Sequence, residues 1–242
     1  MKDEILINTQ LALFLDRLID RPEDRYQRLN EALGGIMDGN LIALPIPIEL
    51  SDIPVVQLSS KDGIYGCNIA RGRIDLFVAG EGRQPFEAKM KTITELSEKL
   101  IAFCGAESLP IKRVGFVSRF FIPEQSQDKV IEQAIVPGFR DLFGIESESA
   151  FVEVFVRYVR SVKFDEFDFN VNNFVTLERM SARLSGEPSE VAGIQITRDF
   201  NSNPTENLSS KFSNFSIRKF IEQSKESFKL KEIEKTLWPT LE

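Results

Sequence analysis

Alternating apolar and polar positions predict a long strand over Ile111–Pro123, which reads IKRVGFVSRFFIP. Because successive side chains of a strand point to opposite faces, this segment has two faces of different composition. One face is apolar and predicts contact with a core, whereas the other combines arginine with apolar side chains. The apolar face comprises Val114, Phe116, Phe120 and Ile122, and the other comprises Arg113, Val117, Arg119 and Phe121.

The same pattern predicts further strands on both sides of this segment. Arg71-Gly72 separates two of them, either as a hairpin turn or as a bend within one strand. Prolines at 45, 47 and 54 cannot donate to a ladder, so 41–60 is predicted as an extended edge strand and loop. A helix from Leu11 onward is an alternative to the first strand. The other predicted strands cover 4–15, 64–70, 73–79, 150–163, 164–184 and 191–200.

Apolar residues at helical spacing predict four helices. The clearest begins at Pro85 and ends near Gly105, with one continuous apolar stripe. A shorter helix follows Pro22 and ends by Gly39. The other two are predicted over 126–143 and 209–237, and the last contains several phenylalanines that could pack on the sheet or against a second copy.

The order of these elements predicts the fold class. A strand, a helix, several strands and a helix occur over 1–107, and the same order recurs over 108–242. We therefore expect an α+β protein with two pseudo-duplicated halves, mainly antiparallel sheets and helices packed on one side. The two halves are expected to form one compact body, although no repeat is visible at the level of individual residues.

The composition excludes several kinds of chemistry. The chain of 242 residues has no histidine, which excludes Ser-His-Asp and Cys-His catalysis. Cys67 and Cys104 are far apart, so neither a disulfide framework nor a thiolate metal site is predicted. The net charge of -7 argues weakly against wholesale nucleic-acid binding. No apolar run is long enough to span a bilayer, so a cytoplasmic location is expected. No cofactor is expected.

Four short patches resemble a family of sporadically distributed bacterial proteins of similar length and unknown function. The resemblance covers most of the chain from about residue 41, although Phe116-Val117-Ser118-Arg119 replaces the Gly-Leu-Arg-Tyr type of strand that the family favours. It implies an architecture and no activity. The patches are Tyr65–Phe77, Lys112–Pro123, Gly193–Phe200 and the C-terminal helix with Phe228 near its end.

Strict alternation on three strands predicts a surface rich in arginine and phenylalanine. If the strands are neighbours, this mixture is suited to a protein partner or to phosphate contact with base stacking. The alternative is an ordinary solvated face on which Asp75 and Glu153 pair with the arginines. The predicted binding residues are Arg71, Arg73, Phe77, Arg113, Arg119, Phe121, Phe155 and Arg157.

A second hypothesis places a divalent metal ion on carboxylates. Asp165, Asp168 and Asp199 could provide oxygen ligands for Mg²⁺ or Ca²⁺. Alternation does not make these acids converge, so a solvated strand edge is the competing interpretation. Gly34-Gly35 and Gly80-Glu81-Gly82 match no phosphate-binding loop and are predicted as turns.

Together these observations predict a non-catalytic binding protein that engages a macromolecular partner through the arginine and phenylalanine face. A single-stranded nucleic-acid binder and a carboxylate enzyme with a divalent ion are the alternatives. The expected partner is a protein or single-stranded nucleic acid, no membrane contact is expected, and a homodimer is one outcome of the phenylalanine-rich last helix.

Overall fold

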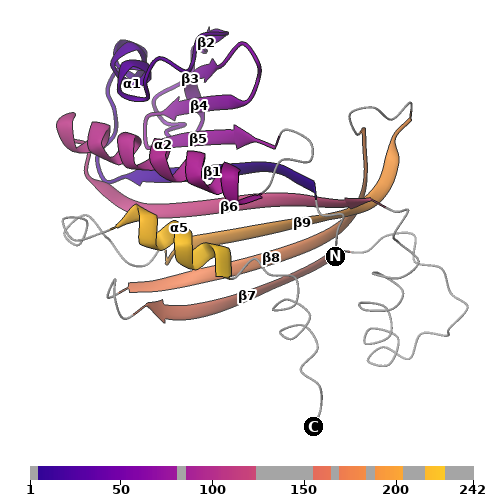
Figure 1. The fold of residues 1–242 in the computed structure, drawn as a ribbon. Helices are drawn as coiled ribbons and strands as arrows, with labels where there is room; N and C mark the ends of the chain where they lie inside the picture. Colours follow the sequence, from indigo (N-terminus) through magenta and orange to yellow (C-terminus); the bar gives the residue numbers. More distant parts are fainter. Residues whose placement is uncertain are drawn as a thin grey trace, which may run out of the picture.

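In the part of the chain that the structure describes, nine strands form a single antiparallel sheet (Figure 1). The computed structural model describes residues 5–80, 86–123, 155–164, 169–183, 189–203 and 216–226. Within these ranges the strand order is β2-β3-β4-β5-β1-β6-β9-β8-β7. The predicted α+β class is therefore confirmed, with one sheet in place of the several sheets that the sequence predicted.

The first part of the chain provides five strands. Arg71 and Gly72 form the turn between β4 and β5, so the hairpin is the correct one of the two predicted connections. The predicted edge segment splits into a short edge strand, a loop with Pro45 and Pro47, and a strand that begins at Pro54. The strands are β1 (Ile5–Leu15), β2 (Leu41–Ala43), β3 (Pro54–Ser59), β4 (Tyr65–Ala70) and β5 (Arg73–Ala79).

The second part of the chain provides four strands. The first of them has the bounds that alternation predicted, and the other three confirm the predicted strands within the described residues. The predicted turn near 185–188 and the predicted helix over 126–143 lie outside those residues. The strands are β6 (Ile111–Pro123), β7 (Phe155–Phe164), β8 (Phe169–Ala182) and β9 (Val191–Ser202).

The two parts meet where β1 pairs with β6. The pairing is antiparallel and runs from Ile5 opposite Phe121 to Leu15 opposite Ile111. In each part the first strand also pairs with the last strand of the meander that follows, because β1 pairs with β5 and β6 pairs with β9. The predicted duplication of the halves stays a prediction, but the strand connections of the two parts correspond.

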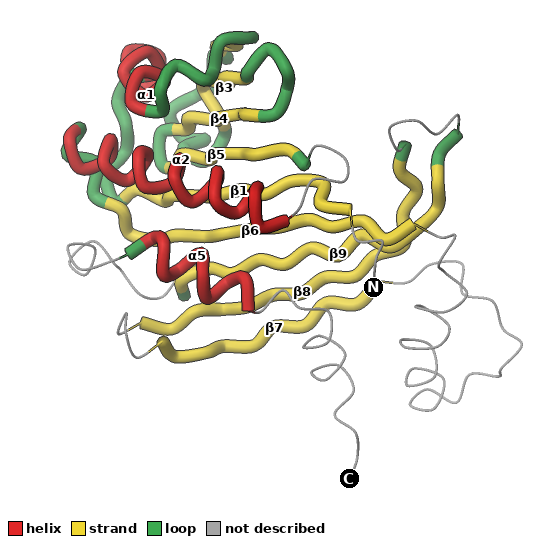
Figure 2. The backbone as a smooth tube through the Cα atoms, viewed as in Figure 1, coloured by secondary structure: helices red, strands yellow, loops and turns green. Residues whose placement is uncertain are grey.

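Three described helices cover one face of the sheet (Figure 2). A 3₁₀ turn at Pro22–Asp24 leads into α1 (Tyr26–Ala32), and positive φ angles at Gly34 and Gly35 follow the helix end. The two longer helices are α2 (Phe86–Ala106) and α5 (Ile217–Glu226). The predicted end at Gly105 is thus one residue early, and α5 falls within the predicted late helix.

The core lies between these helices and the sheet. Leu11 and Leu13 of β1 are fully buried there, together with Met90 and Ile93 of α2. From α5, Phe220 packs on Phe200 of β9 with 4.9 Å between the ring centroids. Removal of these apolar surfaces from water stabilises the arrangement. The described part of the last helix therefore packs on the sheet; Phe228 lies outside the described residues.

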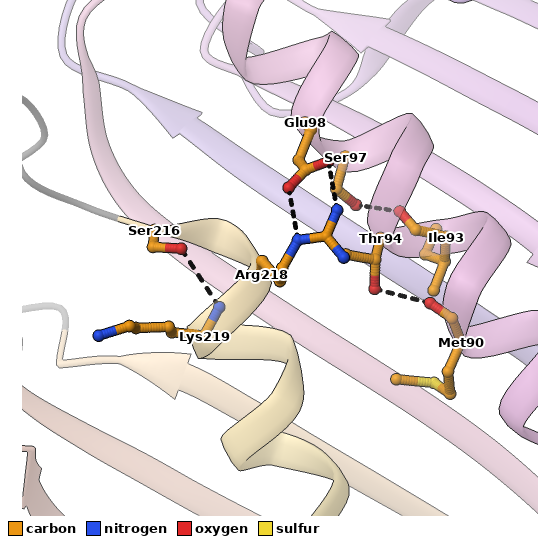
Figure 3. Close-up of polar contacts among 8 residues, drawn as sticks. All are labelled: Met90, Ile93, Thr94, Ser97, Glu98, Ser216, Arg218 and Lys219. Carbon is orange, nitrogen blue, oxygen red and sulfur yellow. Dashed lines mark hydrogen bonds and ion pairs between the residues drawn. The ribbon is translucent and has the colours of Figure 1, made fainter.

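The helices α2 and α5 also contact each other (Figure 3). Arg218 of α5 donates from Nε and Nη2 to the two carboxylate oxygens of Glu98 on α2, at 2.9 and 2.8 Å. Thr94 and Ser97 on α2 are buried, and their hydroxyl groups donate to the carbonyl oxygens one turn earlier. The two buried hydroxyl groups are therefore satisfied within α2 itself.

Candidate binding face

The candidate site is the sheet face that points away from the described helices, called the open face below. Directly paired residues of an antiparallel sheet point to the same side, so the register identifies its members. None of the helices within the described ranges lies over it (Figure 1). The members that bear on function are Asn8, Gln10, Phe14, Arg73, Asp75, Phe77, Arg113, Arg119, Arg157, Phe174, Thr197 and Asp199.

One row of paired residues crosses five strands and includes two of the predicted arginines. Arg157 on β7 is opposite Thr176 on β8, which is opposite Thr197 on β9. Thr197 is opposite Arg119 on β6, and Arg119 is opposite Asn8 on β1, next to a register shift between Leu6 and Asn8. Arg119 donates from Nη1 to Oδ1 of Asn8 at 3.0 Å. Arg119 and Arg157 therefore lie on one face, three strands apart.

A second group lies around the ring of Phe14 on β1. This residue is paired with Arg73 on one side and with Arg113 on the other. The Cζ atom of Arg113 is 4.2 Å from the ring centroid, and that of Arg73 is 5.4 Å from it. Burial, the largest cause, lowers the pKa of Arg113, and the nearby charge of Asp199 opposes this effect. The aromatic ring thus holds two half-buried guanidinium groups.

Asp75 neutralises one of these arginines. Arg73 forms an ion pair with Asp75 through Nε and Oδ2 at 2.7 Å, and Gln10 donates from Nε2 to the other carboxylate oxygen at 2.9 Å. Asp75 is only 2% exposed, so its carboxylate is satisfied beneath these side chains. The ordinary explanation, a charge pair on the sheet face, therefore accounts for Arg73, although the pair lies within β5 and does not cross between strands.

The carboxylate of Asp199 lies near Arg113, Arg119 and Arg157. Burial, the largest cause, raises the pKa of this carboxyl group. Asn201 donates to Oδ1 at 2.9 Å, and the charges of Arg113, Arg157 and Arg119 also act to lower the pKa. Three positive groups thus act on this carboxylate, and they outnumber the two acids of this part of the open face, Asp199 and Glu178.

The open face ends at the edge strand β7. Arg157 is exposed, and its Cζ atom lies 5.0 Å from the ring centroid of Phe174 on β8. Phe155 and Val159, on the same side of β7, are 61% and 56% exposed. Both predicted residues of this strand, Phe155 and Arg157, therefore reach the surface.

Two of the predicted residues, Arg71 and Phe121, are not available on the open face, whereas Phe77 lies on it. Arg71 does not lie on the open face: its Nη1 donates to the carbonyl groups of Ile19 and Asp20, where it holds the loop before α1. Phe121 has the expected orientation but is fully buried, with its ring against Gly193. Phe77 is on the open face and half-buried, opposite Gln10.

Sequence reasoning missed the contribution of β1. Asn8 and Phe14 provide an amide and a ring that contact the arginines, and Gln10 donates to Asp75. Their period-two spacing is visible in the sequence, but nothing local indicates that β1 lies between β5 and β6.

The carboxylate hypothesis gains no support from the described residues. Asp165, Asp168 and also Glu153 lie outside them. In the ranges that the structure describes, no group of three or more acidic or cysteine side chains could hold a metal ion. Asp199 is instead engaged by Asn201 among arginines.

The two cysteines are buried apolar residues of the core. Burial raises the pKa of the Cys67 thiol and raises that of Cys104 to about 12. Neither thiol is therefore a nucleophile at neutral pH. No described helix is both long enough and apolar enough to cross a membrane.

Comparison with known proteins adds no family to this description. No protein-family model matches the chain, and no curated protein matches it either. The resemblance to the bacterial family stays a prediction.

Proposed function

We propose that this protein is a non-catalytic binding protein that engages an acidic segment of a macromolecular partner on its open face. The observation that supports this most strongly is the charge around Asp199, where Arg113, Arg119 and Arg157 act on a single carboxylate. A partner carboxylate placed there would supply the counter-charge that the face lacks. Charge-assisted hydrogen bonds of arginine to carboxylate are among the strong polar contacts in proteins.

The positions of the arginines also support binding. Arg113 lies over Phe14, Arg157 lies over Phe174, and Arg119 is bonded to Asn8. These contacts restrict the guanidinium groups before a partner arrives, which reduces the entropy lost on binding. The open face thus combines an excess of positive charge with side chains already held in position.

An acidic protein segment is favoured over single-stranded nucleic acid for two reasons. Phe14 and Phe174 have guanidinium groups over their rings, so these rings do not offer a bare platform for base stacking. In addition, nucleic acid has a negative charge at every nucleotide, whereas a peptide can place its acidic residues beside the arginines and away from Asp75 and Asp199. The test must therefore distinguish binding of an acidic peptide from binding of single-stranded nucleic acid.

The test uses two fluorescein-labelled probes and fluorescence anisotropy. The first is a peptide of alternating glutamate and valine, and the second is an oligouridylate of similar length. We expect the peptide to bind the wild-type protein and the Arg113→Gln/Arg119→Gln variant to lose at least about tenfold in affinity, because two charge-assisted contacts are removed. Lys61→Gln, an exposed cation of another surface, is the matched control.

Two results would contradict the proposal. Equal affinity of the peptide for the wild-type protein and the double variant would show that the open face is not the binding surface. Tighter binding of the oligouridylate, with a steep loss of affinity as salt is added, would favour a nucleic-acid binder. Arg71 is left unchanged in this design because it contacts the loop carbonyls.

The predicted duplication also belongs to this proposal. The correspondence of β1–β5 with β6–β9 supports two related halves joined by the β1–β6 pairing. Such an arrangement places the first strands of the two halves side by side in the middle of the sheet, and Arg113 and Arg119 lie on one of them.

A further inference from the structure

The two edges of the sheet differ in a way that bears on partners. At one edge, β2 has three residues, and Pro45 and Pro47 follow it closely. A short strand beside prolines is a usual means of preventing another chain from pairing. At the other edge, β7 has ten residues and pairs with β8 without a bulge, from Phe155 opposite Glu178 to Phe164 opposite Phe169. In the described ranges no strand pairs with its outer side.

The backbone of β7 presents donors along that outer side. The N–H of Asn203 donates to the carbonyl oxygen of Asn170, so Asn170 and alternate residues of β8 bond toward β9. The intervening residues of β8 bond toward β7, where Val171 is opposite Val162. By the same alternation, the N–H groups of Val159 and Ser161 point to the outer edge of β7.

The side chains of β7 are exposed and basic. The strand reads FVRYVRSVKF and contains three cations and no acidic residue. Arg157, Arg160 and Lys163 are all exposed, and Phe155 and Val159 are more than half exposed. Basic side chains alone could serve to prevent strand pairing. That role does not require two large apolar side chains beside them on the open face.

From this geometry we infer that the outer edge of β7 takes an extended acidic peptide as a tenth strand of the sheet. The inference rests on the proposed function for the acidic character of the partner, and it adds a second contact at the edge of β7, three strands from Arg113 and Arg119 on β6. The backbone of the peptide would bond to Val159 and Ser161, and its side chains would alternate as the pleat requires. Acidic side chains on the open-face side of that pleat would meet Arg157 and Lys163, and the apolar ones would point to the other face, beside Tyr158 and Val162.

Charge selects this occupant over a second copy of the chain. Pairing of β7 with β7 of another molecule would bring six cations together with no acid between them. An acidic strand instead offsets the three cations of β7 and approaches Arg157, which already acts on Asp199. A self-associated dimer is therefore an outcome that would contradict the inference.

The experiment removes a backbone donor without changing charge. Ser161→Pro deletes the outward N–H but leaves the ladder with β8, and Ser161→Ala is the control. With the labelled glutamate–valine peptide, we expect Ser161→Pro to weaken binding at least about tenfold and Ser161→Ala to change it less than about twofold. Circular dichroism and the melting temperature of each variant verify that the fold is kept.

A second arm leaves the protein unchanged. The same peptide, N-methylated at every residue, keeps its charges and side chains but has no N–H groups with which to join a sheet. We expect this peptide to bind the wild-type protein at least about tenfold more weakly than the unmethylated one. This arm decides the question even if the proline variant does not fold.

The outcomes separate the inference from the proposed function. Peptide binding that requires Arg113 and Arg119 but tolerates Ser161→Pro and N-methylation would overturn edge addition and leave the proposed function standing. A dimer seen by sedimentation, dissociated by Ser161→Pro, would assign the edge to a second copy. Tighter binding of oligouridylate, or no binding of the peptide, would overturn both.

Discussion

Arg113 on β6 lies over the ring of Phe14 on β1, with 4.2 Å between Cζ and the ring centroid. The Nε atom of Arg113 is buried and has no hydrogen-bond partner within the described part of the chain, so the ring is the main support for the cation there. The contact crosses the pairing that joins the two parts of the chain. It therefore links the central strands of the fold to the arginines of the open face.

Phe14→Leu should weaken binding of the glutamate–valine peptide while preserving the fold. The change removes the ring beneath Arg113 and Arg73, and a cation–π contact contributes about 0.5–2 kcal/mol, or several-fold in affinity. Tyr65→Leu removes a ring that packs against the core on the other face of the sheet and is the matched control. Fluorescence anisotropy measures both variants. Equal affinities for the two would show that the ring of Phe14 does not support Arg113.

Asp199→Asn should raise the melting temperature at neutral pH. Burial raises the pKa of this carboxyl group, so the folded protein binds its proton more readily than the unfolded chain. The stabilising effect of that proton is complete below the unfolded pKa of about 3.9 and is lost as pH rises through the folded pKa. The gain from asparagine should therefore shrink as the pH falls from 7 toward about 4.

Differential scanning calorimetry over that pH range measures the melting temperatures. The control is Asp62→Asn, because hydrogen bonds from Ser60 and Ile64 lower the pKa of this exposed carboxyl group. Asp62→Asn should lower the melting temperature at neutral pH, because the folded protein favours the ionised form of Asp62. A loss of stability for Asp199→Asn at neutral pH would mean that the arginines outweigh the effect of burial.

Phe220→Ala should destabilise the protein by about 3–5 kcal/mol, the usual cost of truncating a buried phenylalanine. Phe220 is fully buried against Phe200 and anchors α5 to the sheet. Glu222→Ala, on the exposed side of the same helix, should change stability by less than about 0.5 kcal/mol. Urea denaturation distinguishes the two. Similar stabilities would show that α5 contributes little to the fold.

Replacing each of two glycines by alanine should change the stability of the protein in opposite directions. Gly105 lies inside α2 with nothing within 4 Å of the position that an alanine Cβ would take, so Gly105→Ala should stabilise by about 0.5–1 kcal/mol. At Gly80 the Cβ would overlap the carbonyl oxygen of Leu6, so Gly80→Ala should destabilise the edge of the β1–β5 pairing. Thermal melts of both variants are the measurement, and a matching sign for the two would contradict this expectation.

Local patterns predicted the strands well because alternation is strong where one face is buried. Ile111–Pro123 has the predicted bounds, and its arginines have the predicted orientation. Arg71 was misplaced because the strand ends at Ala70, and the turn at Gly72 breaks the alternation that Arg73 follows. Gly72 itself was the signal for this break.

Contacts between residues far apart in the sequence determine the features that local patterns could not predict. The burial of Phe121 depends on Gly193, a residue of another strand, and the single sheet depends on pairing between β1 and β6. Periodicity within a segment contains no information on which strands are neighbours. The contribution of Asn8, Gln10 and Phe14 to the open face was missed for the same reason.

The β1–β6 pairing has a consequence for how the molecule comes apart. Because these two strands exchange backbone hydrogen bonds in the middle of the sheet, a cut in the chain between α2 and β6 would leave both pieces with a long unsatisfied central edge. Fragments made by such a cut should reassociate into a native-like complex when mixed, and each alone should aggregate. The intact chain should accordingly unfold as one cooperative unit, with no stage at which half of it survives.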